Sequence, residues 1–160
     1  TDPDAGQTFT YTLVSGTDDT DNDAFTLTTA GALKLKTAAN YEAKSSYSIR
    51  VRSTDSGSPV QYFEKAFTIS VTDVNETPTN ITLSNNTVAE NVGPNAAIGT
   101  FSTTDPDAGQ TFTYTLVSGT DDTDNDAFTL TSAGALTLKT AANYEAKSSY
   151  SIRVRSTDSG

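Results

Sequence analysis

The sequence predicts an all-β fold, a seven-stranded Greek-key β-sandwich present in tandem copies. Apolar and polar residues alternate in short segments rich in Thr, Val, Ile, Tyr and Phe, which is the pattern of half-buried strands. Residues 104–160 also repeat residues 1–57 with only two differences, Thr29 to Ser132 and Lys34 to Thr137. The repeat distance of 103 residues suits a whole small domain better than a solenoid unit.

Each strand of one period follows from a short alternating segment between turn signals. Phe9, Tyr11 and Leu13, for example, fall on one face of their segment. Ile98 and Phe101 are out of phase, which indicates a β-bulge. The expected strands, in order through one period, are residues 81–90, 97–103, 112–118, 127–130, 135–140, 150–156 and 66–71.

The connections between these segments carry their own signals. Ala30-Gly31, between two short apolar runs, predicts a hairpin turn. Residues 38–46 resemble a single helical turn. The acidic loop 18–23 hints at a calcium loop of the EF-hand type, but Ala24 stands where that loop requires Gly. We therefore expect a solvated loop with ordinary turn chemistry there.

The strand order predicts two incomplete domains in this chain. Residues 1–75 form a repeat that lacks its first two strands, and residues 76–160 form one that lacks its last strand. Such boundaries are expected for a window of a longer array of near-identical repeats. The alternative is a permutation in which neighbouring copies supply the missing strands.

The composition excludes several classes of function. The chain has 10 Lys and Arg against 20 Asp and Glu, a net charge of −10, so nucleic acid and anionic membranes are not expected partners. It has no His or Cys, which excludes a Ser-His-Asp triad and zinc sites with imidazole or thiolate ligands. No apolar run approaches the roughly 20 residues of a membrane span, so membrane insertion is not expected. An enzyme is not expected.

Acidic clusters recur where strands end, and they suit a hard divalent cation. Ca²⁺ takes six to eight oxygen ligands from carboxylates, amide oxygens and carbonyls. The clusters lie at opposite ends of the expected sandwich, so they can meet only across a short junction between two repeats. They are Val88–Asn91, Asp105–Gly109, Asn40–Glu42, Arg52–Gly57 and Asp73–Pro78.

These five motifs, in this order and over one period, resemble the cadherin repeat, including the cadherin-like modules of bacterial surface proteins. Phe25 also stands where that family places a core Phe. Three positions depart from the family pattern: Asn40 and Glu76 each replace an Asp, and Thr77 replaces an Asn. The resemblance implies an immunoglobulin-like, cadherin-type sandwich that binds two or three Ca²⁺ ions at each junction between repeats.

The resemblance also implies the ligands. The junction inside this chain would use Glu42, Asp73, Asn75, Glu76, Asp105, Asp107 and Asp158. The remaining candidates, which match the same motifs but serve other junctions or outer positions, are Glu90, Asn143, Glu145, Asp2, Asp4, Asp55 and Asn40.

The expected function is that of a calcium-rigidified structural repeat in a long extracellular adhesin, stalk or filament, on a bacterial surface. Its expected partners are neighbouring identical repeats of the same chain and like chains in a filament. The alternative is a carbohydrate- or protein-binding module of a secreted protein. That role would need exposed aromatic side chains, for which Tyr62 and Phe63 are the candidates.

Overall fold

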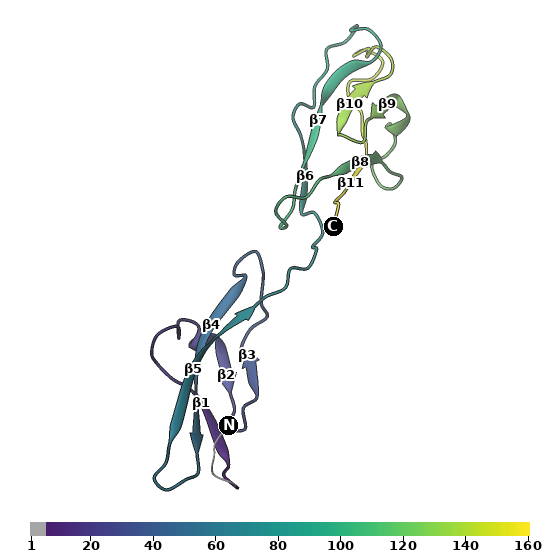
Figure 1. Cartoon of the computed structure of the whole chain (residues 1–160). Coiled ribbons are helices and arrows are strands. Elements are labelled where there is room, and N and C mark those ends of the chain that lie inside the picture. Colours follow the sequence, from purple (N-terminus) through teal and green to yellow (C-terminus); the bar gives the residue numbers. More distant parts are fainter. Residues whose placement is uncertain (1–5) are drawn as a thin grey trace. The chain divides into compact units, whose positions relative to one another are not determined.

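The computed structural model describes residues 6–160, which form two compact all-β units (Figure 1). The first unit ends at Val74 and the second begins at Asn75. The boundary predicted from the sequence lies one residue later. An all-β, immunoglobulin-like sandwich was predicted, and the architecture and its structural neighbours confirm it.

The first unit consists of a three-stranded antiparallel sheet, in the order β1-β4-β5, and a β2–β3 hairpin. The predicted hairpin turn is confirmed, since Gly31 adopts a φ of +94° between β2 and β3. A short 3₁₀ helix, η1, was not predicted and precedes β2. The elements are β1 (Phe9–Leu13), η1 (Asn22–Ala24), β2 (Phe25–Leu27), β3 (Leu33–Leu35), β4 (Ser46–Asp55) and β5 (Tyr62–Ser70).

The second unit consists of a four-stranded sheet, in the order β6-β7-β10-β9, and a β8–β11 pair. Its second half repeats the elements from β1 to β4 of the first unit, but not β5, because residues 104–160 repeat only residues 1–57. The elements are β6 (Asn80–Leu83), β7 (Ala96–Thr104), β8 (Thr113–Leu116), η2 (Asn125–Ala127), β9 (Phe128–Leu130), β10 (Ala135–Leu138) and β11 (Val154–Thr157).

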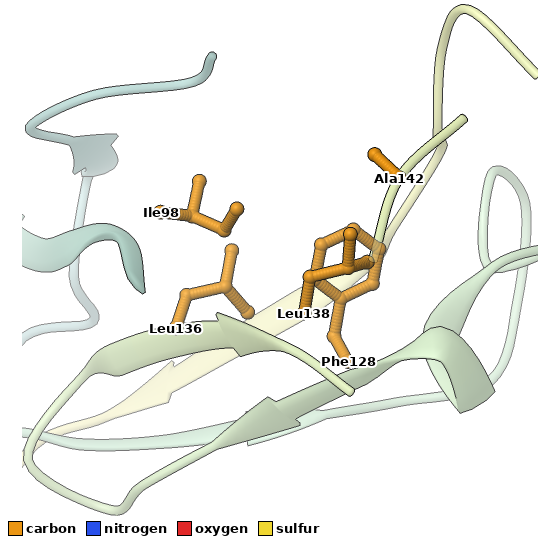
Figure 2. Close-up of a cluster of buried hydrophobic side chains, with 5 residues drawn as sticks. All are labelled: Ile98, Phe128, Leu136, Leu138 and Ala142. Carbon is orange, nitrogen blue, oxygen red and sulfur yellow. The ribbon is translucent and has the colours of Figure 1, made fainter. Parts of the chain in front are cut away.

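The best-formed core belongs to the second unit. Figure 2 shows its five buried side chains, contributed by β7, β9, β10 and the segment after β10: Ile98, Phe128, Leu136, Leu138 and Ala142. The rings of Phe101 on β7 and Tyr114 on β8 stack 6.0 Å apart. A hydrogen bond between the hydroxyl groups of Thr103 and Ser156 (2.6 Å) also connects β7 to β11. The two sheets are therefore joined by both apolar and polar contacts.

The first expected strand, residues 81–90, is wrong in its length, because β6 ends at Leu83. The side chain of Asn85 donates to the carbonyls of Thr87 and Ile98, both at 2.7 Å, and so replaces the backbone ladder beyond that point. The backbone of Asn85 approaches Gly99 so closely that a Cβ there would lie 2.6 Å from the Asn85 carbonyl oxygen. The strand thus ends where a side chain takes over the backbone hydrogen bonds.

The predicted β-bulge is confirmed on β7. Leu136 of β10 pairs with Gly99, but the next residue, Thr137, pairs with Ala97, so Ile98 is the extra residue. The bulge brings Ile98 and Phe101 to the core side despite their odd spacing. Residues 38–46 were expected to form one helical turn. They contain one hydrogen bond of the helical type, from the Lys44 N–H to the Asn40 carbonyl (3.0 Å).

The acidic loop 18–23, which was expected to show only turn chemistry, also connects to a neighbouring strand. Asp19 does cap its own turn, because it accepts from the Gly16 N–H (3.0 Å). Asp21, however, pairs with Lys44 (2.8 Å) and accepts the Ser48 N–H (2.7 Å), so it fastens the loop to β4. Turn chemistry alone was therefore the wrong description of Asp21.

Candidate metal centre

The loop that follows β7 contains the strongest candidate ligands. Asp107 is only 8% exposed, and its Oδ2 accepts the backbone N–H of Glu76 (2.8 Å). Asp105 Oδ1 accepts the Asp107 N–H (3.0 Å), which folds the loop back on itself. The other oxygen of each carboxylate, Asp105 Oδ2 and Asp107 Oδ1, is buried without a hydrogen-bond donor among residues 6–160.

Two buried carboxylate oxygens without donors are costly unless a cation balances them. Burial of an ionised carboxylate without a partner is strongly unfavourable, so proteins pair such groups or use them as metal ligands. The two oxygens come from residues only two apart on a loop that hydrogen bonds hold in place. The local structure therefore presents two fixed anionic oxygens at one end of the second unit.

Other predicted ligands of the second unit lie beside this loop. Asn75 Nδ2 donates to Asp158 Oδ1 (3.2 Å), which connects the start of the unit to the end of β11. Gln110 Nε2 donates to Asn75 Oδ1 (2.8 Å), and its Oε1 accepts from Ser159 Oγ (2.8 Å). Each of the five motif residues of this end therefore has a hydrogen bond to another of them, in two groups: Asn75 with Asp158, and Glu76 and Asp105 with Asp107.

Gln110 was missed in the sequence. It is not a carboxylate and falls outside the acidic motif, yet it bonds to Asn75 and to Ser159, next to Asp158. Its counterpart in the first copy, Gln7, holds a buried Oε1 without a donor among the described residues. The only sequence signal was its position directly after the Asp105–Gly109 motif, in both copies.

Three further candidates lie at the opposite end of the second unit. β6 and β7 are antiparallel, with Asn80 opposite Thr104 near the Asp105 loop and Leu83 opposite Phe101 further along. Residue 90 follows after β6, away from that loop, and its carboxylate accepts the N–H of Tyr144 (3.2 Å). The group at this end comprises Glu90, Asn143 and Glu145, all exposed. The two groups are therefore separate within the second unit.

The candidates of the first unit occupy simpler environments. Glu42 and Asp73 are exposed, and Asn40 accepts the Ala43 N–H (2.6 Å), as Asn143 accepts that of Ala146 (2.8 Å). Asp55 Oδ1 accepts the N–H groups of Gly57 (3.0 Å) and Gln61 (2.9 Å). Asp2 and Asp4 lie outside the described residues.

Three carboxylates outside the candidate site have lowered pKa values. Hydrogen bonds from Arg52, which has the larger effect, and from Arg50 lower the pKa of Glu64. The hydrogen bond from Lys44, followed by the Ser48 N–H, lowers the pKa of Asp21. Lys147 and the Ser151 N–H do the same for Asp124 in the second unit. These carboxylates already have cationic partners and serve the fold.

Comparisons with known proteins agree with this architecture. No family model matches the sequence. Human protocadherin gamma-C4 is 32% identical over 168 aligned positions, which cover 99% of this chain but only 18% of that protein. Among solved structures, Drosophila N-cadherin EC1-4 aligns with a TM-score of 0.68 at 20% identity, over 94% of this chain and 37% of that chain. Mouse cadherin-23 EC22-24 aligns with a TM-score of 0.64 at 23% identity, over 98% of this chain and 55% of that chain.

The chain therefore spans less than a fifth of the length of protocadherin gamma-C4 and part of each cadherin fragment. No helix within residues 6–160 is long and apolar enough to cross a membrane. The repeat motifs, the antiparallel sandwich and the similarity to two groups of cadherin proteins agree with one another. The chain consists of cadherin-like β-sandwich domains.

Proposed function

We propose that the chain is a calcium-dependent structural segment of an extracellular adhesin, stalk or filament. The observation that carries the proposal is the pair of buried carboxylate oxygens without donors, Asp105 Oδ2 and Asp107 Oδ1. A bound cation would balance both. The fold class alone would not support this, because a β-sandwich hosts many functions.

The donor set fits Ca²⁺ better than a transition metal. The candidates offer carboxylate and amide oxygens, and the chain has no His or Cys to favour zinc or copper. Asp105, Asp107 and Asp158 supply carboxylates, and Asn75 supplies an amide. Ca²⁺ accepts this mixture and tolerates irregular geometry.

Ca²⁺ takes six to eight oxygens, more than the two oxygens without donors that Asp105 and Asp107 present. As the family resemblance implies, we propose that Glu42 and Asp73 of the first unit complete the set, together with Glu76. Two or three ions per junction remain our expectation. By neutralising clustered carboxylates, the ions would hold successive repeats in one orientation, whereas repulsion would loosen them when calcium is removed.

The proposed location is extracellular, where millimolar calcium suits the weaker sites of extracellular modules. The proposed partners are neighbouring repeats of the same chain and like chains. One neighbour in the structural comparison is described as a cis-dimer of protocadherin gammaB7 EC3-6. A bacterial source stays a prediction from the Thr-rich, Cys-free composition, since the curated relative above is a human protein.

A binding module is the second candidate function. Tyr62 and Phe63 are 62% and 72% exposed, and Arg52 lies 4.3 Å from the ring of Tyr62. However, they are consecutive residues of β5, so their side chains point to opposite faces of the sheet. They cannot form one continuous stacking platform, which weakens the case for a sugar site.

The test is thermal unfolding of the chain while free calcium is raised from chelator conditions to about 10 mM. Saturation at one hundred times Kd should stabilise the folded state by about 2.7 kcal/mol for one site. Asp107→Asn keeps an acceptor for the Glu76 N–H but loses the charge, so it should abolish most of the calcium response. Asp126→Asn, an exposed residue outside the site, is the matched control.

An unchanged melting temperature across the calcium range would contradict the proposal. A response that survives in Asp107→Asn but disappears in Asp126→Asn would place the metal elsewhere. Magnesium at the same concentration serves as a comparison, because its stricter octahedral geometry should give a smaller shift.

A further inference from the structure

The side chain of Gln110 belongs to a closed ring of hydrogen bonds at the end of the second unit that carries the Asp105 loop. Gln110 Nε2 donates to Asn75 Oδ1 (2.8 Å), and Asn75 Nδ2 donates to Asp158 Oδ1 (3.2 Å). Ser159 Oγ donates to Gln110 Oε1 (2.8 Å), and the peptide bond between Asp158 and Ser159 closes the ring. Gln110 makes two of these three hydrogen bonds, so the ring cannot form without it.

A backbone group fixes the direction of the hydrogen bonds in the ring. The Thr111 N–H donates to Ser159 Oγ (3.2 Å), and a backbone N–H can only donate. The Ser159 hydroxyl accepts there and gives its own proton to Gln110 Oε1. The NH₂ end of the Gln110 amide is therefore left for Asn75. The oxygen of the Asn75 amide consequently faces Gln110, and its NH₂ group faces the Asp158 carboxylate.

The ring is connected to the loop that holds the two oxygens without donors. Gln110 follows that loop directly in the sequence. Glu76, the residue after Asn75, donates its backbone N–H to Asp107 Oδ2 (2.8 Å). Two successive residues are thus attached to the same stretch of chain, Glu76 through its backbone and Asn75 through its side chain.

The twin of Gln110 in the first copy, Gln7, provides an internal comparison. The Thr8 N–H donates to Ser56 Oγ (3.1 Å), as the equivalent residues do in the second unit. Gln7 Oε1 is nevertheless buried without a donor among residues 6–160. The bond between the threonine and the serine therefore does not by itself bring the serine hydroxyl to the glutamine. In the second unit this contact occurs together with the bond to Asn75.

We propose that Gln110 is a positioning residue of the metal centre, which holds the Asn75 amide against the Asp158 carboxylate before calcium binds. The inference rests on the proposed function, because both partners are expected calcium ligands. The Asn75 oxygen has two lone pairs, so it can accept the Gln110 bond and still face a cation. A residue that orients metal ligands through hydrogen bonds typically changes the affinity about 10–100-fold when it is lost.

The first experiment measures the order of the Asn75 side chain by NMR in chelator. Gln110→Met keeps the length of the side chain but removes both hydrogen bonds, and Gln110 is only partly buried, so the variant should fold. The heteronuclear NOE of the Asn75 amide should match the backbone in the native chain. In Gln110→Met it should fall to the value of an exposed side chain such as Asn86. Equal values in the two chains would overturn the positioning role.

The matched control is the same substitution in the other copy. Gln7→Met removes the twin side chain from the first unit and leaves Gln110 in place. It should change neither the NOE of the Asn75 amide nor the calcium affinity of this centre. A loss of Asn75 order in Gln7→Met as large as in Gln110→Met would contradict the local ring as its cause.

Calcium titration of the same variants tests the consequence. Gln110→Met should raise the Kd about tenfold. Ser159→Ala should also weaken binding, but it should have no further effect in the Gln110→Met background, because Ser159 acts through Gln110. Additive losses would refute the ring.

The titration also separates this inference from the proposed function. If the native chain binds calcium and Gln110→Met binds it equally tightly, the role of Gln110 is wrong while the proposed function stands. If the native chain binds no calcium, the proposed function is wrong, and the role of Gln110 with it.

Discussion

Glu64 shows how a single residue organises the surface of the first unit. Its two carboxylate oxygens accept from Arg50 and Arg52 on the neighbouring strand, at 3.0 and 2.6 Å. These hydrogen bonds lower its pKa below the ordinary value of 4.5. Because the folded state binds the proton less tightly than the unfolded state, the contribution of Glu64 to stability is complete above pH 4.5 and declines as the pH falls through its lowered pKa.

This predicts an acid-sensitive stability that depends on Glu64. Glu64→Gln should lower the free energy of unfolding of the first unit at pH 7 and reduce the loss of stability between pH 5 and pH 3. Denaturant unfolding at a series of pH values measures both effects. Asp23→Asn makes the same charge change at an exposed position and is the control. Parallel pH profiles for the native chain and Glu64→Gln would contradict the assignment.

The residue scale also shows the limit of sequence reasoning. Asp18, Asp19, Asp21 and Asp23 look alike in the sequence, and all were expected to act as turn residues. Asp21 differs from the other three because the folded chain places Lys44 beside it, and the two form an ion pair. The equivalent ion pair in the second copy joins Asp124 and Lys147 at 2.8 Å. Likewise, the acidic motifs predicted Asp105 and Asp107 as ligands, but which of their oxygens lack a donor depends on where nearby backbone N–H groups lie.

At the scale of elements, the two near-identical copies provide an internal comparison. Leu138 on β10 is 1% exposed beneath Ile98 and its neighbours, whereas its twin Leu35 on β3 is only partly buried. The difference comes from β6 and β7, which accompany only the second copy among the described residues. Burial is therefore a property of the neighbours and not of the local sequence.

This comparison predicts unequal costs for one substitution. Leu138→Ala should destabilise the second unit by about 2–5 kcal/mol, because it removes a fully buried side chain and leaves a cavity. Leu35→Ala should cost clearly less. Urea unfolding of the two variants measures the difference. Equal losses would mean that the burial of these twins differs less in solution than in the structure.

The hydrophobic pattern predicted the faces of the strands better than their partners. It placed the bulge at Ile98 correctly, because only an extra residue brings both Ile98 and Phe101 to the core. It overestimated the first strand, because the Asn85 side chain competes for backbone bonds at a position where alternation continues. It predicted that residues 76–160 lack their last strand but not that the strand expected at residues 150–156 would begin only at Val154.

At the scale of the whole molecule, the net charge of −10 is consistent with a cation-dependent protein. Cadherin-like domains were predicted from the order of five weak motifs, and the comparisons with cadherins support that prediction. Order along the chain was informative because each motif falls at a strand end. The number of ions was not predictable, because it depends on the coordination geometry at each oxygen.

The most direct test of the central claim is isothermal titration calorimetry of Ca²⁺ into the metal-free chain. We expect saturable binding of two or three ions at Kd values of about 10⁻⁴–10⁻³ M, the range of extracellular modules. The Asp107→Asn variant should lose at least one of these sites, and Asp126→Asn should retain them all. If the native chain shows no saturable calcium binding, or if Asp107→Asn binds the same number of ions as tightly, the proposed metal centre is wrong.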